Sequence, residues 1–158
     1  MLFRSEREIA PELEVFDLGM AQFARRLLAH GLVRAPLYAN LMLGFPNSAP
    51  ADARSLVALV DALPAGTTWA AAGLGAFQAP VNALAIAMGG HVRTGLEDNP
   101  WLDAAGERPA TNAGLVERAV AAATAVDRSI ATPDETQSML GLRSPALATS
   151  PGVAGPHD

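Results

Sequence analysis

The sequence has no cysteine, few aromatic residues, no excess of positive charge and no long apolar run. Without cysteine, disulfide bonds and thiolate metal sites are excluded. Lysine and arginine total 11 against 16 aspartate and glutamate residues, so the net charge of −5 argues against nucleic acid as a partner. Residues 83–90, the longest apolar run, are too few to span a bilayer. Residues 1–8 are too charged for a signal peptide. We therefore expect a cytoplasmic protein with no membrane partner.

The 158 residues present are 50% hydrophobic, which is enough for one domain with a real core. Short apolar segments bounded by turn residues predict four buried parallel strands at 13–17, 37–44, 68–73 and 91–97. Apolar residues at i, i+3, i+4 and i+7 predict a helix after each strand, at 20–30, 51–63, 78–88 and 112–127. Strands that alternate with helices in this way indicate a parallel sheet with right-handed crossovers.

A last short helix is predicted just after this alternating region. Thr132 fits the N-cap, Pro133 the first helical position and Glu135 a capping box, and the helix should end near Gly141. We expect residues 1–142 to form the folded part. Residues 143–158, rich in Pro, Ala, Gly and Ser, should form a disordered tail.

Two α/β architectures suit four such units, a small doubly wound sheet and half of a (β/α)8 barrel. The doubly wound sheet predicts a glycine-rich phosphate loop after the first strand. The residues at that point, Phe16-Asp17-Leu18-Gly19-Met20, do not match G-x-G-x-x-G. The half-barrel also gives the charged strand residues an interior to face, so we favour it.

Side-chain alternation predicts an ion pair between the first and last strands. If Leu13 and Val15 pack against helices, Glu14 points to the other face, and the same argument places Arg93 there. Burying either charge alone costs on the order of several kcal/mol, whereas a pair is tolerated. A structural salt bridge without catalytic duty is the alternative interpretation.

Two adjacent carboxyl groups, Glu97 and Asp98, end the last predicted strand. Active sites of parallel barrels lie at this end of the strands. Because neighbouring strand residues face opposite ways, we expect the two groups to act separately. Glu97 suits a metal ligand or a general base. Asp98 begins the following loop and could lie above a bound substrate. The alternative is an ordinary strand end followed by an Asp-Asn-Pro turn.

Other polar or flexible positions give weaker signals. Gly73 and Gly75 lie between a strand and a helix, where backbone amides can approach a phosphate group, although most such glycines are turns. Asn40 is expected to face inward and to need partners. The sequence has no His-x-His or H-E-x-x-H motif, so these residues alone supply no convincing metal site.

Three blocks of the sequence resemble one enzyme family. The blocks are residues 11–20 (PELEVFDLGM), 82–99 (NALAIAMGGHVRTGLEDN) and 131–135 (ATPDE) with 140–142 (LGL). They are similar to segments of the beta-keto acid cleavage enzymes, in the same order along the chain. The similarity extends over about residues 5–142 and corresponds to strands five to eight with their helices, the C-terminal half of a (β/α)8 barrel.

This resemblance implies a zinc-dependent reaction of a beta-keto acid with acetyl-CoA, which gives acetoacetate and a new CoA thioester. It implies that Glu97 is a zinc ligand and that Asp98 is the base that takes a proton from the keto acid. Arg93 and Glu14 would position and tune that base. The type activity, cleavage of 3-keto-5-aminohexanoate, belongs to lysine degradation.

The family's two zinc-binding histidines come from a His-x-His in the other half of the barrel. We therefore expect an incomplete zinc site, and activity only with a complementing N-terminal half. Two alternatives remain. One is a non-catalytic half-barrel that self-associates as a homo-oligomer. The other is a different barrel enzyme that binds phosphate at Gly73 and Gly75.

Overall fold

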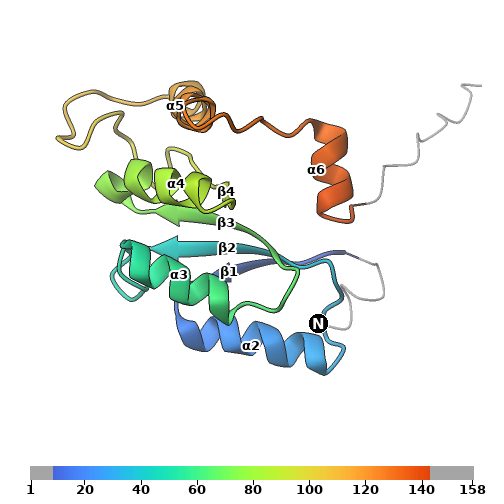
Figure 1. Cartoon of the computed structure of the whole chain (residues 1–158). Helices are drawn as coiled ribbons and strands as arrows, with labels where there is room; N and C mark the ends of the chain where they lie inside the picture. Colours follow the sequence, from blue (N-terminus) through green and yellow to red (C-terminus); the bar gives the residue numbers. More distant parts are fainter. Residues whose placement is uncertain (1–8, 143–158) are drawn as a thin grey trace, which may run out of the picture.

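The computed structural model describes residues 9–142, and the predicted tail at 143–158 lies outside this range. The described residues form an α/β fold with a four-stranded parallel sheet in the order β1-β2-β3-β4 (Figure 1). The strands are β1 (Glu12–Val15), β2 (Tyr38–Leu43), β3 (Thr68–Gly73) and β4 (His91–Val92). The helices are α2 (Leu18–Ala29), α3 (Ala53–Ala62), α4 (Gln78–Ala87), α5 (Asn112–Thr124) and α6 (Pro133–Met139), with a 3-10 turn η1 at Gly75–Phe77. The predicted alternation of strands and helices is confirmed.

One face of the sheet packs against α2, α3 and α4 and forms the main core. The strands contribute apolar residues at alternate positions, such as Leu41 and Ala71, and the helices contribute Ala21, Leu56 and Val81. This alternation follows from the period of two along a strand, and it leaves the opposite face for polar residues. Helix α5 lies beyond α4, and α6 lies at the end of the sheet where the strands begin (Figure 1).

Side-chain caps fix where the helices begin. Asp17, Asp52 and Thr111 each accept a hydrogen bond from a backbone N–H in the first turn of α2, α3 and α5. The capping box of Thr132 and Glu135 at the start of α6 is present as predicted.

The last strand is much shorter than the predicted segment 91–97. Ladder pairing of β4 with β3 covers only His91 and Val92, and the N–H of Arg93 adds one more bond to the Ala71 carbonyl. Residues 96–98 form a turn. The prediction was wrong here because side chains of α4, rather than a neighbouring strand, donate hydrogen bonds to the backbone carbonyls of Arg93 and Gly95.

Within the described residues, no helix has the length and apolar character needed to cross a bilayer.

Candidate active site

The face of the sheet opposite the helices carries the polar side chains. Strand register places Glu14 beside Asn40, Asn40 beside Ala70, and Ala70 beside His91. Because every second residue shares a face, Glu12 and Arg93 belong to this side as well. Glu12 and Glu14 therefore stand on β1, Arg93 directly follows β4 at the other edge of the sheet, and a neutral strip lies between them.

Arg93 joins three carboxyl groups from two parts of the chain. Its Nη1 donates to Oε1 of Glu14 at 2.6 Å, its Nη2 to Oε2 of Glu97 at 3.1 Å and its Nε to Oδ2 of Asp98 at 3.2 Å. The predicted Glu14–Arg93 ion pair is confirmed. It links the two edge strands across the sheet, and the small buried residues Ala70 and Ala72 of β3 leave room for this crossing.

The three carboxyl groups differ strongly in exposure. The side chain of Asp98 is 5% exposed, that of Glu14 is 47% exposed and that of Glu97 is 85% exposed. Glu97 and Asp98 were expected on opposite faces, but both contact the same guanidinium group. The difference arises because they lie in a turn rather than in a strand, so strand alternation does not apply to them.

The charges around Arg93 favour its ionised form. Burial by itself lowers the pKa of this guanidinium, but the charge of Asp98 and hydrogen bonds with Glu14 and Asp98 outweigh burial and raise the pKa. One fixed positive charge among three carboxyl groups leaves unused acceptor capacity. Such a site can orient a carboxyl group for proton transfer.

Asn40 and its neighbours form a second polar group on the same face. Asn40 is 2% exposed, donates to the carboxyl group of Glu12 and accepts a hydrogen bond of 3.2 Å from the Tyr38 hydroxyl. Burial raises the pKa of Tyr38, and the charge of Glu12 adds to this effect while Arg93 opposes it. Asn40 is buried and has hydrogen-bond partners on the sheet face opposite the helices. Glu12 was missed, although its spacing of two from Glu14 places both on one face.

The two glycines proposed for phosphate binding have structural roles in the described residues. A side chain at Gly73 would approach the Phe77 carbonyl oxygen within 2.4 Å, so the close packing of η1 requires glycine. Gly75 has a positive φ of 56°, and its N–H donates to the backbone oxygen of Asp98 at 2.8 Å. That N–H therefore anchors the loop that carries Glu97 and Asp98.

The described residues do not by themselves fit a zinc ion. Among residues 9–142 there is no group of three or more His, Cys, Asp and Glu side chains arranged to hold a metal. Catalytic zinc sites usually have three protein ligands. Glu97 can offer one exposed carboxylate, which is already in contact with Arg93.

The chain matches a family model described as beta-keto acid cleavage enzyme over residues 3–142. It is 45% identical over 138 residues to a 3-keto-5-aminohexanoate cleavage enzyme of Fusobacterium nucleatum, a match that covers 87% of this chain and 50% of the relative. It is 37% identical over 134 residues to a 3-dehydrocarnitine:acetyl-CoA trimethylamine transferase of Rhizobium meliloti, covering 85% and 44%. It is 35% identical over 139 residues to a 3-oxoadipate:acetyl-CoA acetyltransferase of Cupriavidus necator, covering 86% and 49%. The chain thus spans about half the length of these relatives.

Proposed function

Because this chain belongs to the beta-keto acid cleavage enzyme family, we propose that it forms part of a site where a beta-keto acid reacts with acetyl-CoA. The products are acetoacetate and the CoA thioester of the rest of the keto acid. The observation that carries this proposal is the buried Asp98 carboxyl group held by Arg93 beside two further carboxyl groups.

Asp98 is the proposed base. It takes a proton from the carbon between the keto and carboxylate groups, and the electron pair of that C–H bond becomes an enolate. The enolate carbon attacks the acetyl-CoA carbonyl and expels CoA thiolate, and the thiolate then attacks the original keto carbon. Retro-Claisen cleavage of the bond between that carbon and the former enolate carbon gives the new thioester and the enolate of acetoacetate, which takes back the proton held by Asp98. Arg93 holds Asp98 in place, and Glu14 fixes the far side of the guanidinium group.

The proposal includes zinc only at a site whose ligands come partly from this chain and partly from elsewhere. Glu97 would supply one carboxylate ligand, and the remaining ligands would have to come from outside the described residues. Bound zinc would act as a Lewis acid on the oxygen atoms of the keto acid.

The fold supports the proposal that residues 1–142 form strands five to eight of a (β/α)8 barrel. Within the described residues, β1 and β4 each pair with one strand only, so both edges of the sheet are open. A complementing half would cover these edges, and a homo-oligomer is the alternative occupant. Relatives act on 3-keto-5-aminohexanoate, 3-dehydrocarnitine and 3-oxoadipate according to their names, and we propose an acid of this class as substrate.

The test is complementation. The chain is co-expressed with the N-terminal half of the Fusobacterium nucleatum relative, and acetoacetate is measured with acetyl-CoA and each of the three keto acids. We expect acetoacetate from at least one acid and a loss of about 10²- to 10⁴-fold in Asp98→Asn. Asp61→Asn, an exposed position on α3, is the matched control and should keep full activity. A complex that is active on none of the three acids would contradict the proposal, as would an Asp98→Asn variant as active as the parent.

Phosphate binding at Gly73 and Gly75 remains a prediction. If these residues hold a phosphate group, inorganic phosphate or CoA should raise the melting temperature of the chain. The bond between Gly75 and Asp98 favours a structural role instead, in which case phosphate at the same ionic strength as a chloride control leaves the melting temperature unchanged.

A further inference from the structure

Two buried amide side chains of α4 hold the backbone that leads from Arg93 to Asp98. Gln78 is fully buried and Asn82 is 4% exposed. They are four residues apart, which places them on the same side of the helix. Buried amides of this kind need hydrogen-bond partners, and both find theirs in the segment after β4.

Asn82 acts where ladder pairing ends. Its Nδ2 donates to the Ala71 carbonyl of β3 at 3.1 Å and to the Arg93 carbonyl at 3.0 Å. The Arg93 carbonyl lies one residue beyond β4, where no strand in the described chain receives it. Asn82 therefore takes the place of a neighbouring strand and sets the point where the chain leaves the sheet.

Gln78 acts two residues further along. Its Nε2 donates to the Gly95 carbonyl at 3.1 Å, while its Oε1 accepts from Nη2 of Arg118 at 2.8 Å. Arg118 is anchored in turn by a bond from Nη1 to the Leu102 carbonyl at 2.8 Å. The orientation of the Gln78 amide is thus fixed by a residue of α5.

The loop beyond Gly95 is tied to its surroundings at further points. The N–H of Leu96 donates to Oδ1 of Asn112 at 3.0 Å. The N–H of Gly75 donates to the Asp98 carbonyl at 2.8 Å. These bonds return the chain toward Arg93, so that Nε of Arg93 meets the carboxyl group five residues later.

We propose that Asn82 and Gln78 are positioning residues for the Arg93–Asp98 pair. They touch backbone atoms of the loop rather than the carboxyl groups, and they act by fixing where Arg93 and Asp98 stand relative to each other. Their link to catalysis rests on the proposed function of Asp98 as a base, whereas their effect on the geometry does not.

The geometric test uses the nitrogen-15-labelled full chain without ligand. The Nε–H signal of Arg93 is assigned by its disappearance in Arg93→Lys, and its exchange with water is measured by NMR. Asn82→Leu removes both donors and keeps the same number and branching of side-chain heavy atoms. Gln78→Glu removes the donor to Gly95 and keeps an acceptor for Arg118.

We expect exchange of this Nε–H to become about tenfold faster in each variant, the factor that corresponds to about 1.4 kcal/mol. Arg128→Gln is the matched control, because Arg128 donates to carbonyls at the other end of α4, including those of Ile86 and Gly89. It should lower thermal stability without changing the Arg93 signal. Unchanged exchange in a folded Asn82→Leu or Gln78→Glu protein, or equal acceleration in Arg128→Gln, would overturn the proposal. If Asn82→Leu does not fold, Gln78→Glu decides.

The catalytic test uses the complemented enzyme. A positioning role predicts that kcat falls at least about tenfold in Gln78→Glu while KM for acetyl-CoA stays within about twofold. Absence of activity in the parent complex would count against the proposed function alone. The positions of Arg93 and Asp98 relative to each other are tested separately by the exchange of the Arg93 Nε–H with water. A Gln78→Glu enzyme with parental kcat would overturn the positioning role.

Discussion

A guanidinium group offers five N–H donors in a planar fork, and Arg93 uses this fork to contact three carboxyl groups at once. The three contacts are unequal in energy. The pair with Glu97 is exposed and contributes little, whereas the pair with the buried Asp98 stabilises a group that has lost its water. Arg93 is therefore both a structural link across the sheet and the direct neighbour of the proposed base.

Replacing Arg93 by lysine should show that the fork, and not the charge alone, holds the site. Lysine keeps the positive charge but is a single point of contact on a flexible stem. We expect Arg93→Lys to lower the free energy of unfolding by about 1–2 kcal/mol in urea titrations. Glu97→Gln, which removes an exposed contact, is the control and should change it by less than about 0.5 kcal/mol. Equal effects in both variants would contradict this assignment.

His91, at the start of β4, should make stability depend on pH. Burial lowers its pKa from the ordinary 6.5, and the charge of Arg128 adds to this effect. The folded chain thus takes up a proton at lower pH than the unfolded chain, so stability present above pH 6.5 is lost as the pH falls through the lowered pKa. In urea titrations from pH 7 downward, His91→Asn should reduce this loss. An unchanged slope in His91→Asn would contradict the prediction.

At the scale of elements, two arginines close the C-terminal ends of neighbouring helices. Arg25 of α2 donates to the carbonyls of Asp61, Ala62 and Leu63 at the end of α3. Arg128, after α5, donates to the Ile86 and Gly89 carbonyls at the end of α4. The last carbonyls of a helix lack intrahelical partners and carry partial negative charge, so a cation there satisfies both needs. Each arginine thus fastens one helix to the next.

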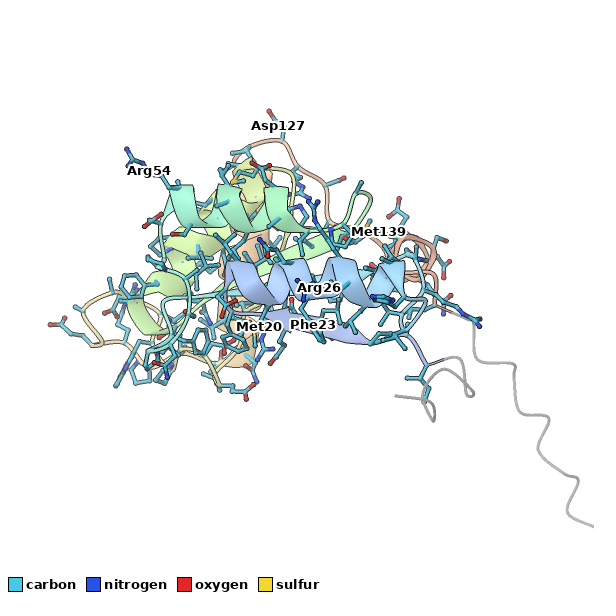
Figure 2. All side chains as sticks on the ribbon, turned by 90° about the horizontal axis from the view of Figure 1, so that it is seen from below. Met20, Phe23, Arg26, Arg54, Asp127 and Met139 are labelled. Atoms are coloured by element: carbon cyan, nitrogen blue, oxygen red, sulfur yellow. The ribbon has the colours of Figure 1, made fainter. Side chains whose placement is uncertain are left out.

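Loss of one such cap should destabilise the chain measurably. In Arg25→Met the stem remains but three carbonyls lose a charged donor, and we expect the free energy of unfolding to fall by about 1–3 kcal/mol. Arg26→Met provides the matched control on the same helix, where the exposed Arg26 is labelled in Figure 2. Chemical denaturation followed by circular dichroism measures both. A similar loss in the two variants would show that removal of a positive charge from α2, rather than loss of the hydrogen bonds to the end of α3, is responsible.

At the scale of the whole molecule, the described chain leaves apolar residues exposed on the helices beyond both edges of the sheet. Met20 is 45% exposed and Phe23 is 56% exposed, and both stand on α2, next to the edge strand β1 (Figure 2). Helix α5, beyond the opposite edge, exposes Val116 and Val120 by 52% and 39%. An open parallel sheet with apolar residues at its margins favours association, which agrees with the proposed complementing half or homo-oligomer.

Phe23 should therefore contribute to association of the purified chain. We expect sedimentation to show species larger than a monomer, and Phe23→Glu to raise the dissociation constant at least about tenfold. Val57→Glu is the control, because Val57 is exposed by 45% on α3, away from the open edge. A monomeric parent chain, or equal effects of both variants, would contradict this role of the edge.

The sequence alone determined the features that depend on local patterns. Alternating strands and helices, the parallel sheet and the capping box at Thr132 follow from periodicity and from residues a few positions apart, and all are confirmed. Strand alternation also predicted the contact of Glu14 with Arg93. The resemblance to the beta-keto acid cleavage enzymes rested on three blocks in order, and the family match over residues 3–142 confirms it.

Tertiary structure decided what depends on contacts between distant segments. The early end of β4 and the approach of Asp98 to Arg93 require hydrogen bonds from α4, whose residues Gln78 and Asn82 read in the sequence as ordinary helix positions. Burial, which separates Asp98 from Glu97, likewise depends on the loops packed around them. A strand pattern assigns faces only while ladder pairing lasts. Where side chains replace the ladder, only the folded chain shows which carboxyl group Arg93 holds and which one remains in solvent.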